Sequence, residues 1–159
     1  MRTSIARVTI GFAFTQVGCV GPLSEDFEAS YLTLTEACRH DAIGDHRWIP
    51  SIIPEGSTDI VEFHNIDTNA TWGCFRLNGH ADQLVDLLGG GAAQATRGSL
   101  SEGPRSWFRT RPWWPDSMAR DTIEIFEFRE PPAAPALPAT TVRVGLDRVT
   151  DTACFRRRR

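Results

Sequence analysis

The strongest constraint on the fold is a set of short segments in which apolar and polar residues alternate, because that period is typical of half-buried β-strands. Five such segments span residues 59–64, 70–77, 121–129, 141–146 and 152–156. In the second segment, Trp72 and Phe75 are expected to point to opposite faces of a sheet. The alternation slips between Ile125 and Phe126, which indicates either a bulge or burial on both faces.

Two helices are expected beside this sheet. Residues 80–88 place apolar side chains at the i, i+3, i+4 and i+7 positions of an amphipathic helix. A shorter helix is expected over residues 35–44, with Thr35 as its N-cap and Gly44 at its end. The sequence therefore predicts an α+β fold, with an antiparallel sheet of about five strands, one covering helix and a short N-terminal helix.

Length and composition favour a single domain. The chain has 159 residues, of which 41% are apolar, so residues 19–159 can bury a core of their own. Residues 92–120 show no periodicity and form a long loop, which is either an ordered covering or binding loop or a disordered insertion. Four prolines make residues 131–138 a stiff linker.

Residues 1–18 have the organisation of a bacterial signal peptide. Two arginines and no acid precede an apolar stretch at residues 8–15, and Gly18 directly precedes Cys19. Lipoprotein signals are cleaved before a cysteine whose thiol receives the lipid, so Cys19 is the expected lipidation site. Gln16 and several polar residues interrupt this pattern. Soluble export, or a cytoplasmic protein that begins with a strand, are the alternatives.

The other cysteines are Cys38, Cys74 and Cys154, and their spacing matches no zinc ribbon and no redox pair. We expect them to be buried thiols that pack as small apolar side chains. One disulfide with one free thiol is the alternative in an oxidising compartment.

Residues 31–78 combine several short motifs, namely Trp48-Ile49-Pro50, Ile53-Pro54, Ser57-Thr58-Asp59-Ile60, His64, Asp67-Thr68-Asn69 and Gly73-Cys74-Phe75-Arg76. In combination they resemble the core of a family of small bacterial exported proteins that are labelled lipoproteins or YbbD head proteins. The resemblance extends weakly to residues 147–155. It implies export and often lipidation, in agreement with Cys19, and it carries no established catalytic residues.

His64, Asp67, His80 and Asp82 are the best candidates for a metal-binding or acid–base cluster, since they flank one hairpin and the start of the following helix. Their spacing matches no known metal motif. We therefore expect Asp67 and Asn69 to build the turn through side-chain hydrogen bonds while the histidines are half exposed. No metal, no cofactor and no catalytic residue is predicted.

The segment around residues 107–115 is unusually rich in tryptophan and arginine. Large rigid aromatic side chains and arginine dominate the binding energy of interfaces. The expected binding surface therefore consists of Trp107, Arg109, Arg111, Trp113 and Trp114. Stacking on sugars or nucleobases is a related use. In the alternative interpretation, the tryptophans fold back over the open face of the sheet.

Charge gives two further indications. The net charge of −3 disfavours a general nucleic-acid binder. The four arginines at residues 156–159 predict a solvated tail, or a contact with anionic lipid head groups if Cys19 tethers the chain to a membrane.

Together these features predict an uncharacterised, exported, non-enzymatic binding module of the cell envelope, held at the membrane only by lipid on Cys19. Its partner is an unknown envelope protein or ligand, with no nucleic acid. One alternative is a small metal-dependent or hydrolytic enzyme that uses His64, Asp67 and His80. The other is an immunity-type inhibitor of a secreted toxin.

Overall fold

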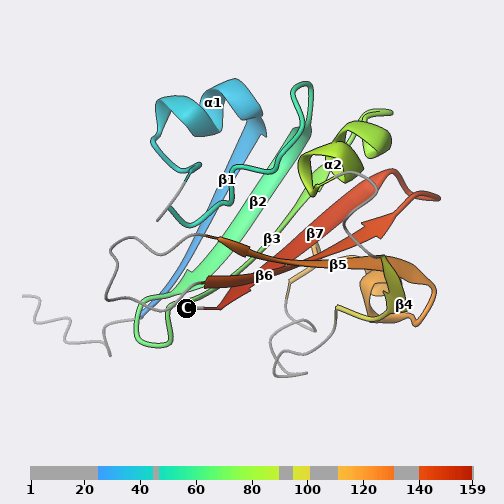
Figure 1. Cartoon of the computed structure of the whole chain (residues 1–159). Coiled ribbons are helices and arrows are strands. Elements are labelled where there is room, and N and C mark those ends of the chain that lie inside the picture. Colours follow the sequence, from blue (N-terminus) through green and yellow to red (C-terminus); the bar gives the residue numbers. More distant parts are fainter. Residues whose placement is uncertain (1–24, 45–46, 90–94, 101–110, 131–139, 159) are drawn as a thin grey trace, which may run out of the picture.

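The computed structural model describes residues 25–44, 47–89, 95–100, 111–130 and 140–158. They form one antiparallel sheet whose strands are β1 (Asp26–Thr33), β2 (Thr58–Asn65), β3 (Ala70–Arg76), β4 (Thr96–Gly98), β5 (Ile123–Glu130), β6 (Thr140–Asp147) and β7 (Thr152–Arg158). The order across the sheet is β1-β2-β3-β7-β6-β5-β4. Two helices, α1 (Leu34–Arg39) and α2 (Ala81–Leu87), lie above the sheet in Figure 1, and η2 (Asp116–Ala119) is a single 3-10 turn.

The prediction of an α+β fold with about five strands is wrong, because the described residues are mostly β, with seven strands in one sheet and only two short helices. Most of β1 is exposed, since it lies at the edge of the sheet, so the hydrophobic alternation that marks a strand is weak there. The other missed strand, β4, is only three residues long and falls within the segment expected to be a loop.

The two helices lie close to their expected positions, but both ends of the first differ from the prediction, since α1 spans Leu34–Arg39 and does not reach Gly44. Thr33 and not Thr35 is the N-cap of α1, and its hydroxyl accepts a hydrogen bond from the Glu36 backbone N–H. The chain leaves α1 after Arg39, and Asp41 then adopts a positive φ of 55°. The predicted amphipathic helix is confirmed as α2, which buries Leu84.

Alternation along the strands places a hydrophobic cluster on each face of the sheet. One face, here called the helix face, is covered by α1, α2 and the segment with Ile49, Ile52 and Ile53. The opposite face, here called the loop face, is covered by Leu100, Trp114 and Met118. The predicted long loop over residues 92–120 therefore contains an ordered cover for the second face.

Both sequence details of the strands are borne out. Trp72 belongs to the cluster on the loop face and Phe75 to the cluster on the helix face. Ile125 and Phe126 are likewise buried on opposite faces, while the pairing of β5 with β6 continues in regular register. The slip in alternation therefore reflects burial on both faces and not a bulge.

The C-terminal arginines, expected to form a solvated tail, instead belong to strand β7 as far as Arg158. Arg156, Arg157 and Arg158 lie in β7, which is hydrogen-bonded between β3 and β6. Alternation turns Arg157 to the helix face, where its side chain is 2% exposed and forms a 2.6 Å ion pair with Glu130. A buried charge of this kind is tolerated only because it is paired.

Candidate binding groove

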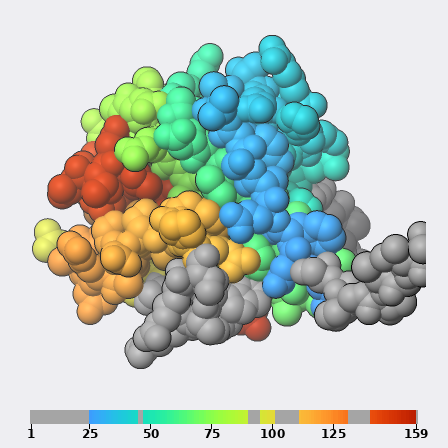
Figure 2. All heavy atoms as spheres, turned by 180° about the vertical axis from the view of Figure 1, so that it is seen from behind, coloured from blue at the N-terminus to red at the C-terminus, as the bar shows by residue number. Residues whose placement is uncertain are grey.

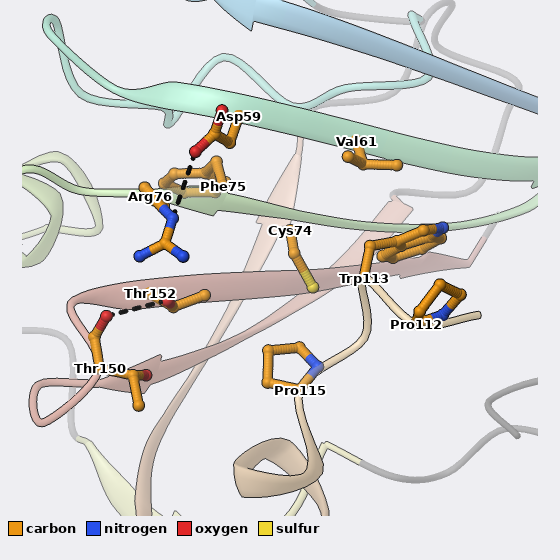
Figure 3. Close-up of a pocket in the computed structure, with 10 residues that line it drawn as sticks. All are labelled: Asp59, Val61, Cys74, Phe75, Arg76, Pro112, Trp113, Pro115, Thr150 and Thr152. Carbon is orange, nitrogen blue, oxygen red and sulfur yellow. Dashed lines mark hydrogen bonds and ion pairs between the residues drawn. The ribbon is translucent and has the colours of Figure 1, made fainter.

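A groove of about 640 Å³ opens on the loop face of the sheet (Figure 3). Its floor and one end come from β2, β3 and β7, and its other end comes from the segment that precedes η2. The residues that line it are Asp59, Val61, Cys74, Phe75, Arg76, Pro112, Trp113, Pro115, Thr150 and Thr152. The groove thus joins apolar walls to a small number of polar groups, which is the usual composition of a ligand site.

Asp59 and Arg76 provide the charged end of the groove. The pairing of β2 with β3 shifts register between Thr58 and Val61, and Asp59 in that irregular stretch has a positive φ of 51°. The carboxylate of Asp59 lies 3.2 Å from Nε of Arg76. Both side chains remain about 60% exposed, so the pair adds little to stability and leaves polar atoms open to a ligand.

Trp113 provides the aromatic end, and several contacts hold it there. Its indole Nε1 donates a hydrogen bond of 2.8 Å to Glu28 on β1. The same carboxylate forms an ion pair with Arg111, whose guanidinium lies 3.7 Å from the centre of the Phe63 ring. Figure 2 shows this segment, in orange, against the blue atoms of β1. The segment that carries Trp113, here called the wall, is therefore fixed to the sheet through both Trp113 and Arg111.

The expected binding surface is divided by the structure. Trp114 is buried in the cluster on the loop face, and Arg111 and Trp113 pack partly against the same face. Trp107 and Arg109 lie outside the described residues. Trp114 thus covers the face of the sheet, as the alternative interpretation expected. Trp113 also lines the groove.

The cysteines correct another expectation, since Cys74 and Cys154 form a disulfide with an S–S distance of 2.07 Å. They are directly opposite in the pairing of β3 with β7, which places both side chains on the same face. Cys74 lines the groove, where Figure 3 shows its sulfur atom. Cys38 is free and exposed, so the three cysteines are not three buried thiols. Cys19 lies outside the described residues.

The four residues expected as a polar cluster do not converge. His64 is opposite Thr71 near the start of β3, whereas His80 follows the end of β3 by four residues. Asp82 accepts a hydrogen bond of 2.8 Å from Arg148, far along the sheet from His64. Among the residues that the structure describes, no group of three or more His, Cys, Asp or Glu side chains could hold a metal.

Asp67 lies in the exposed turn between β2 and β3, but the turn is built by Asn65. The side-chain oxygen of Asn65 accepts hydrogen bonds from both the backbone N–H and the hydroxyl of Thr68, each at 2.8 Å. Asn69 contributes through its positive φ of 50°. Asp67 instead forms a hydrogen bond with Glu25, which raises the pKa of the Glu25 carboxyl.

His64 has a different environment from the one expected, because it is 9% exposed on the helix face. Its ring stacks on Trp48 at 3.8 Å and on Phe27 at 5.2 Å, and Nδ1 lies 2.9 Å from Glu62. Burial raises the pKa of Glu62, and the interaction with His64 opposes that shift. Sequence reasoning missed this pair, although its spacing of two residues on one strand signals a shared face.

The family model of the YbbD head domain matches residues 25–76, which contain β1, α1, β2 and β3. The resemblance predicted from the sequence is thereby confirmed for this part of the chain. No curated protein and no solved structure matches the chain.

Proposed function

With residues 25–76 as a YbbD head region, we propose that the chain is an exported, non-enzymatic binding module whose ligand occupies the groove on the loop face. The YbbD head region supplies one end of the groove through Asp59 and Arg76. The other end, which carries Trp113, comes from outside that region. The ligand is therefore held jointly by the family segment and by a wall that the rest of the chain adds.

The chemistry of the groove favours a short carbohydrate chain as the ligand. The C–H face of a sugar ring is apolar and packs on an aromatic ring such as that of Trp113. Its hydroxyl groups both donate and accept hydrogen bonds, which suits the exposed carboxylate of Asp59, the guanidinium of Arg76 and the threonine hydroxyls nearby. An aromatic platform and a paired charge at opposite ends of one groove are the observation that carries this proposal.

Export is supported by the Cys74–Cys154 disulfide. Disulfides persist in oxidising compartments and are rare in the reducing cytosol. We infer that the signal at residues 1–18 directs the chain to the bacterial envelope, where lipid on Cys19 anchors it. Within the described part of the chain, no helix is long and apolar enough to span a membrane.

Binding rather than catalysis is proposed because the titratable residues suggested for an enzyme are dispersed. His64 is stacked between aromatic rings, and Asp82 is held by Arg148. A general acid or base must instead lie within hydrogen-bond reach of a shared substrate position. The acidic net charge of −3 supports a ligand other than nucleic acid.

The test is an array of neutral and acidic oligosaccharides, probed with the purified chain and followed by calorimetric titration of the best binder. Trp113→Ala and Arg76→Gln are each expected to lower its affinity at least tenfold. The Arg76 side chain is 61% exposed, so this variant keeps the fold even if Trp113→Ala loosens the wall. Arg97→Gln removes an exposed arginine elsewhere and is the matched control. Absence of any binding glycan, or equal affinity in all variants, would overturn the proposal.

A further inference from the structure

A second, smaller cleft on the loop face is lined almost entirely by arginine. Its volume is about 160 Å³. Its lining residues are Thr141, Arg143, Arg156 and Arg158, from the neighbouring strands β6 and β7. None of them lines the groove described above.

The register of the sheet forces these positive charges together. Arg143 lies directly opposite Arg156, and Thr141 lies directly opposite Arg158. Opposite residues in antiparallel strands have Cβ atoms about 4.5–5.5 Å apart, where like charges destabilise the pairing. Arg129 on β5 is opposite Thr141 and extends the positive charge to a third strand. A cluster of this kind gains stability when an anion binds between the guanidinium groups.

Nearby acidic groups in the described residues only partly balance this charge. Glu127 lies 3.7 Å from Arg143, but its side chain is 60% exposed. On β1, Asp26 accepts a hydrogen bond from Asn65, and Glu28 interacts with Trp113 and Arg111. Arg143 and Arg156 also take part in other interactions, so it is the gathering of three arginines around one cleft, and not any unpaired donor, that favours an anion here.

We propose that this arginine cleft binds a phosphate group. Guanidinium groups present planar pairs of N–H donors that match the oxygens of a phosphate, and three of them can contact one such group from different sides. The Thr141 hydroxyl adds a fourth donor. The group can come from a soluble phosphate compound or from the head group of an anionic lipid, because both present the same oxygens.

Alternation along β7 places the arginines that line the cleft on one face of the sheet and the arginine of the buried ion pair on the other. Arg156 and Arg158 point to the cleft, while Arg157 between them is buried on the other face with Glu130. Substitutions at Arg156 and Arg158 therefore test the cleft without breaking the buried ion pair. Arg120 is exposed and does not line the cleft, so Arg120→Gln is the control for a simple loss of charge.

The experiment compares the two sources of phosphate. Calorimetric titration of the chain with pyrophosphate tests soluble binding. Sedimentation with vesicles of phosphatidylcholine, with and without phosphatidylglycerol, tests lipid binding. Saturable binding in either assay, reduced at least tenfold by Arg156→Gln and by Arg158→Gln but less than twofold by Arg120→Gln, supports the proposal and identifies the source.

Stability provides a second readout. Binding raises the melting temperature of the parent chain when pyrophosphate is added, and the two cleft variants lose this rise although they fold. Failure of pyrophosphate and of anionic vesicles to bind would overturn the proposal. Equal losses in Arg156→Gln and Arg120→Gln would also overturn it, since they would indicate a non-specific charge effect.

Discussion

Glu62 is a carboxyl group that folding moves out of water. It is 3% exposed on the helix face and its interaction partner is the Nδ1 atom of His64. Burial disfavours the charged form of a carboxyl group more than this single partner favours it, and the pKa of Glu62 is therefore raised above its ordinary value of 4.5.

This shift predicts a specific pH dependence of stability. Because the pKa is raised in the folded state, the folded chain binds the proton more tightly than the unfolded chain does. The stabilisation from Glu62 is complete below pH 4.5 and is lost as the pH rises through the folded pKa. The free energy of unfolding of the parent chain, relative to Glu62→Gln, is therefore expected to fall across that window in urea titrations.

The matched control is Glu55→Gln, which removes an exposed carboxyl group. A difference between the parent chain and Glu62→Gln that rises with pH would contradict the assignment, as would a difference that stays constant from pH 4 to pH 8.

Several of these residue positions follow from the sequence and others do not. The opposite orientations of Trp72 and Phe75 follow from the period of a strand alone. The pairing of Cys74 with Cys154 depends on β7 lying beside β3, and a separation of 80 residues contains no information about that neighbour. The stacking of His64 on Trp48 likewise depends on the path of a proline-containing connection.

At the level of elements, the segment from Arg111 to Ala119 decides how the second face of the sheet is covered. Its composition suggested a contact surface, and nothing in its spacing shows which tryptophan is buried. In the folded chain, Trp114 is the tryptophan that is buried, and it lies with Met118 in the cluster that contains Phe63. The edge strand β1 was not predicted, because most of its residues are exposed and show no periodic pattern of apolar side chains.

Trp114→Ala is expected to destabilise the fold by about 3–5 kcal/mol, the usual cost of removing a large buried aromatic side chain. Thermal and urea unfolding measure this loss. Val149→Ala, at a side chain that is 96% exposed, is the comparison and should change stability by less than about 0.5 kcal/mol. Equal stabilities of the two variants would mean that this segment does not cover the sheet.

The disulfide connects β3 to β7 and so joins the segment that matches the YbbD head domain model to the C-terminal part of the sheet. It closes a separation of 80 residues, for which loss of the crosslink costs about 2–5 kcal/mol. The double variant Cys74→Ala/Cys154→Ala should therefore melt at a markedly lower temperature than the oxidised chain. Peptide mapping without reductant should recover the two cysteines in one crosslinked pair.

Cys38→Ser is the matched control, because that thiol is free and exposed, and its melting temperature should equal that of the parent chain. A crosslink between Cys38 and either of the other cysteines would contradict the assigned pairing.

For the whole molecule, one sheet joins the segment that matches the family model to strands and a covering segment outside that match. Residues 25–76 provide three strands, and β7 continues the sheet into the strands outside the family match. The segment with Trp113 then returns across the loop face to Glu28, so residues 85 positions apart in the chain meet beside the groove. The groove is therefore a product of the complete sheet and of neither part alone.

The most direct test of this account is the indole N–H resonance of Trp113, followed by NMR as the best glycan from the array is added. The resonance is identified by its loss in Trp113→Phe. The account predicts that the Trp113 resonance shifts in a saturable manner together with the Arg76 Nε–H resonance. The disulfide between Cys74 and Cys154 is expected to stay intact throughout the titration. Shifts confined to other residues, with Trp113 and Arg76 unchanged, would contradict the proposed groove.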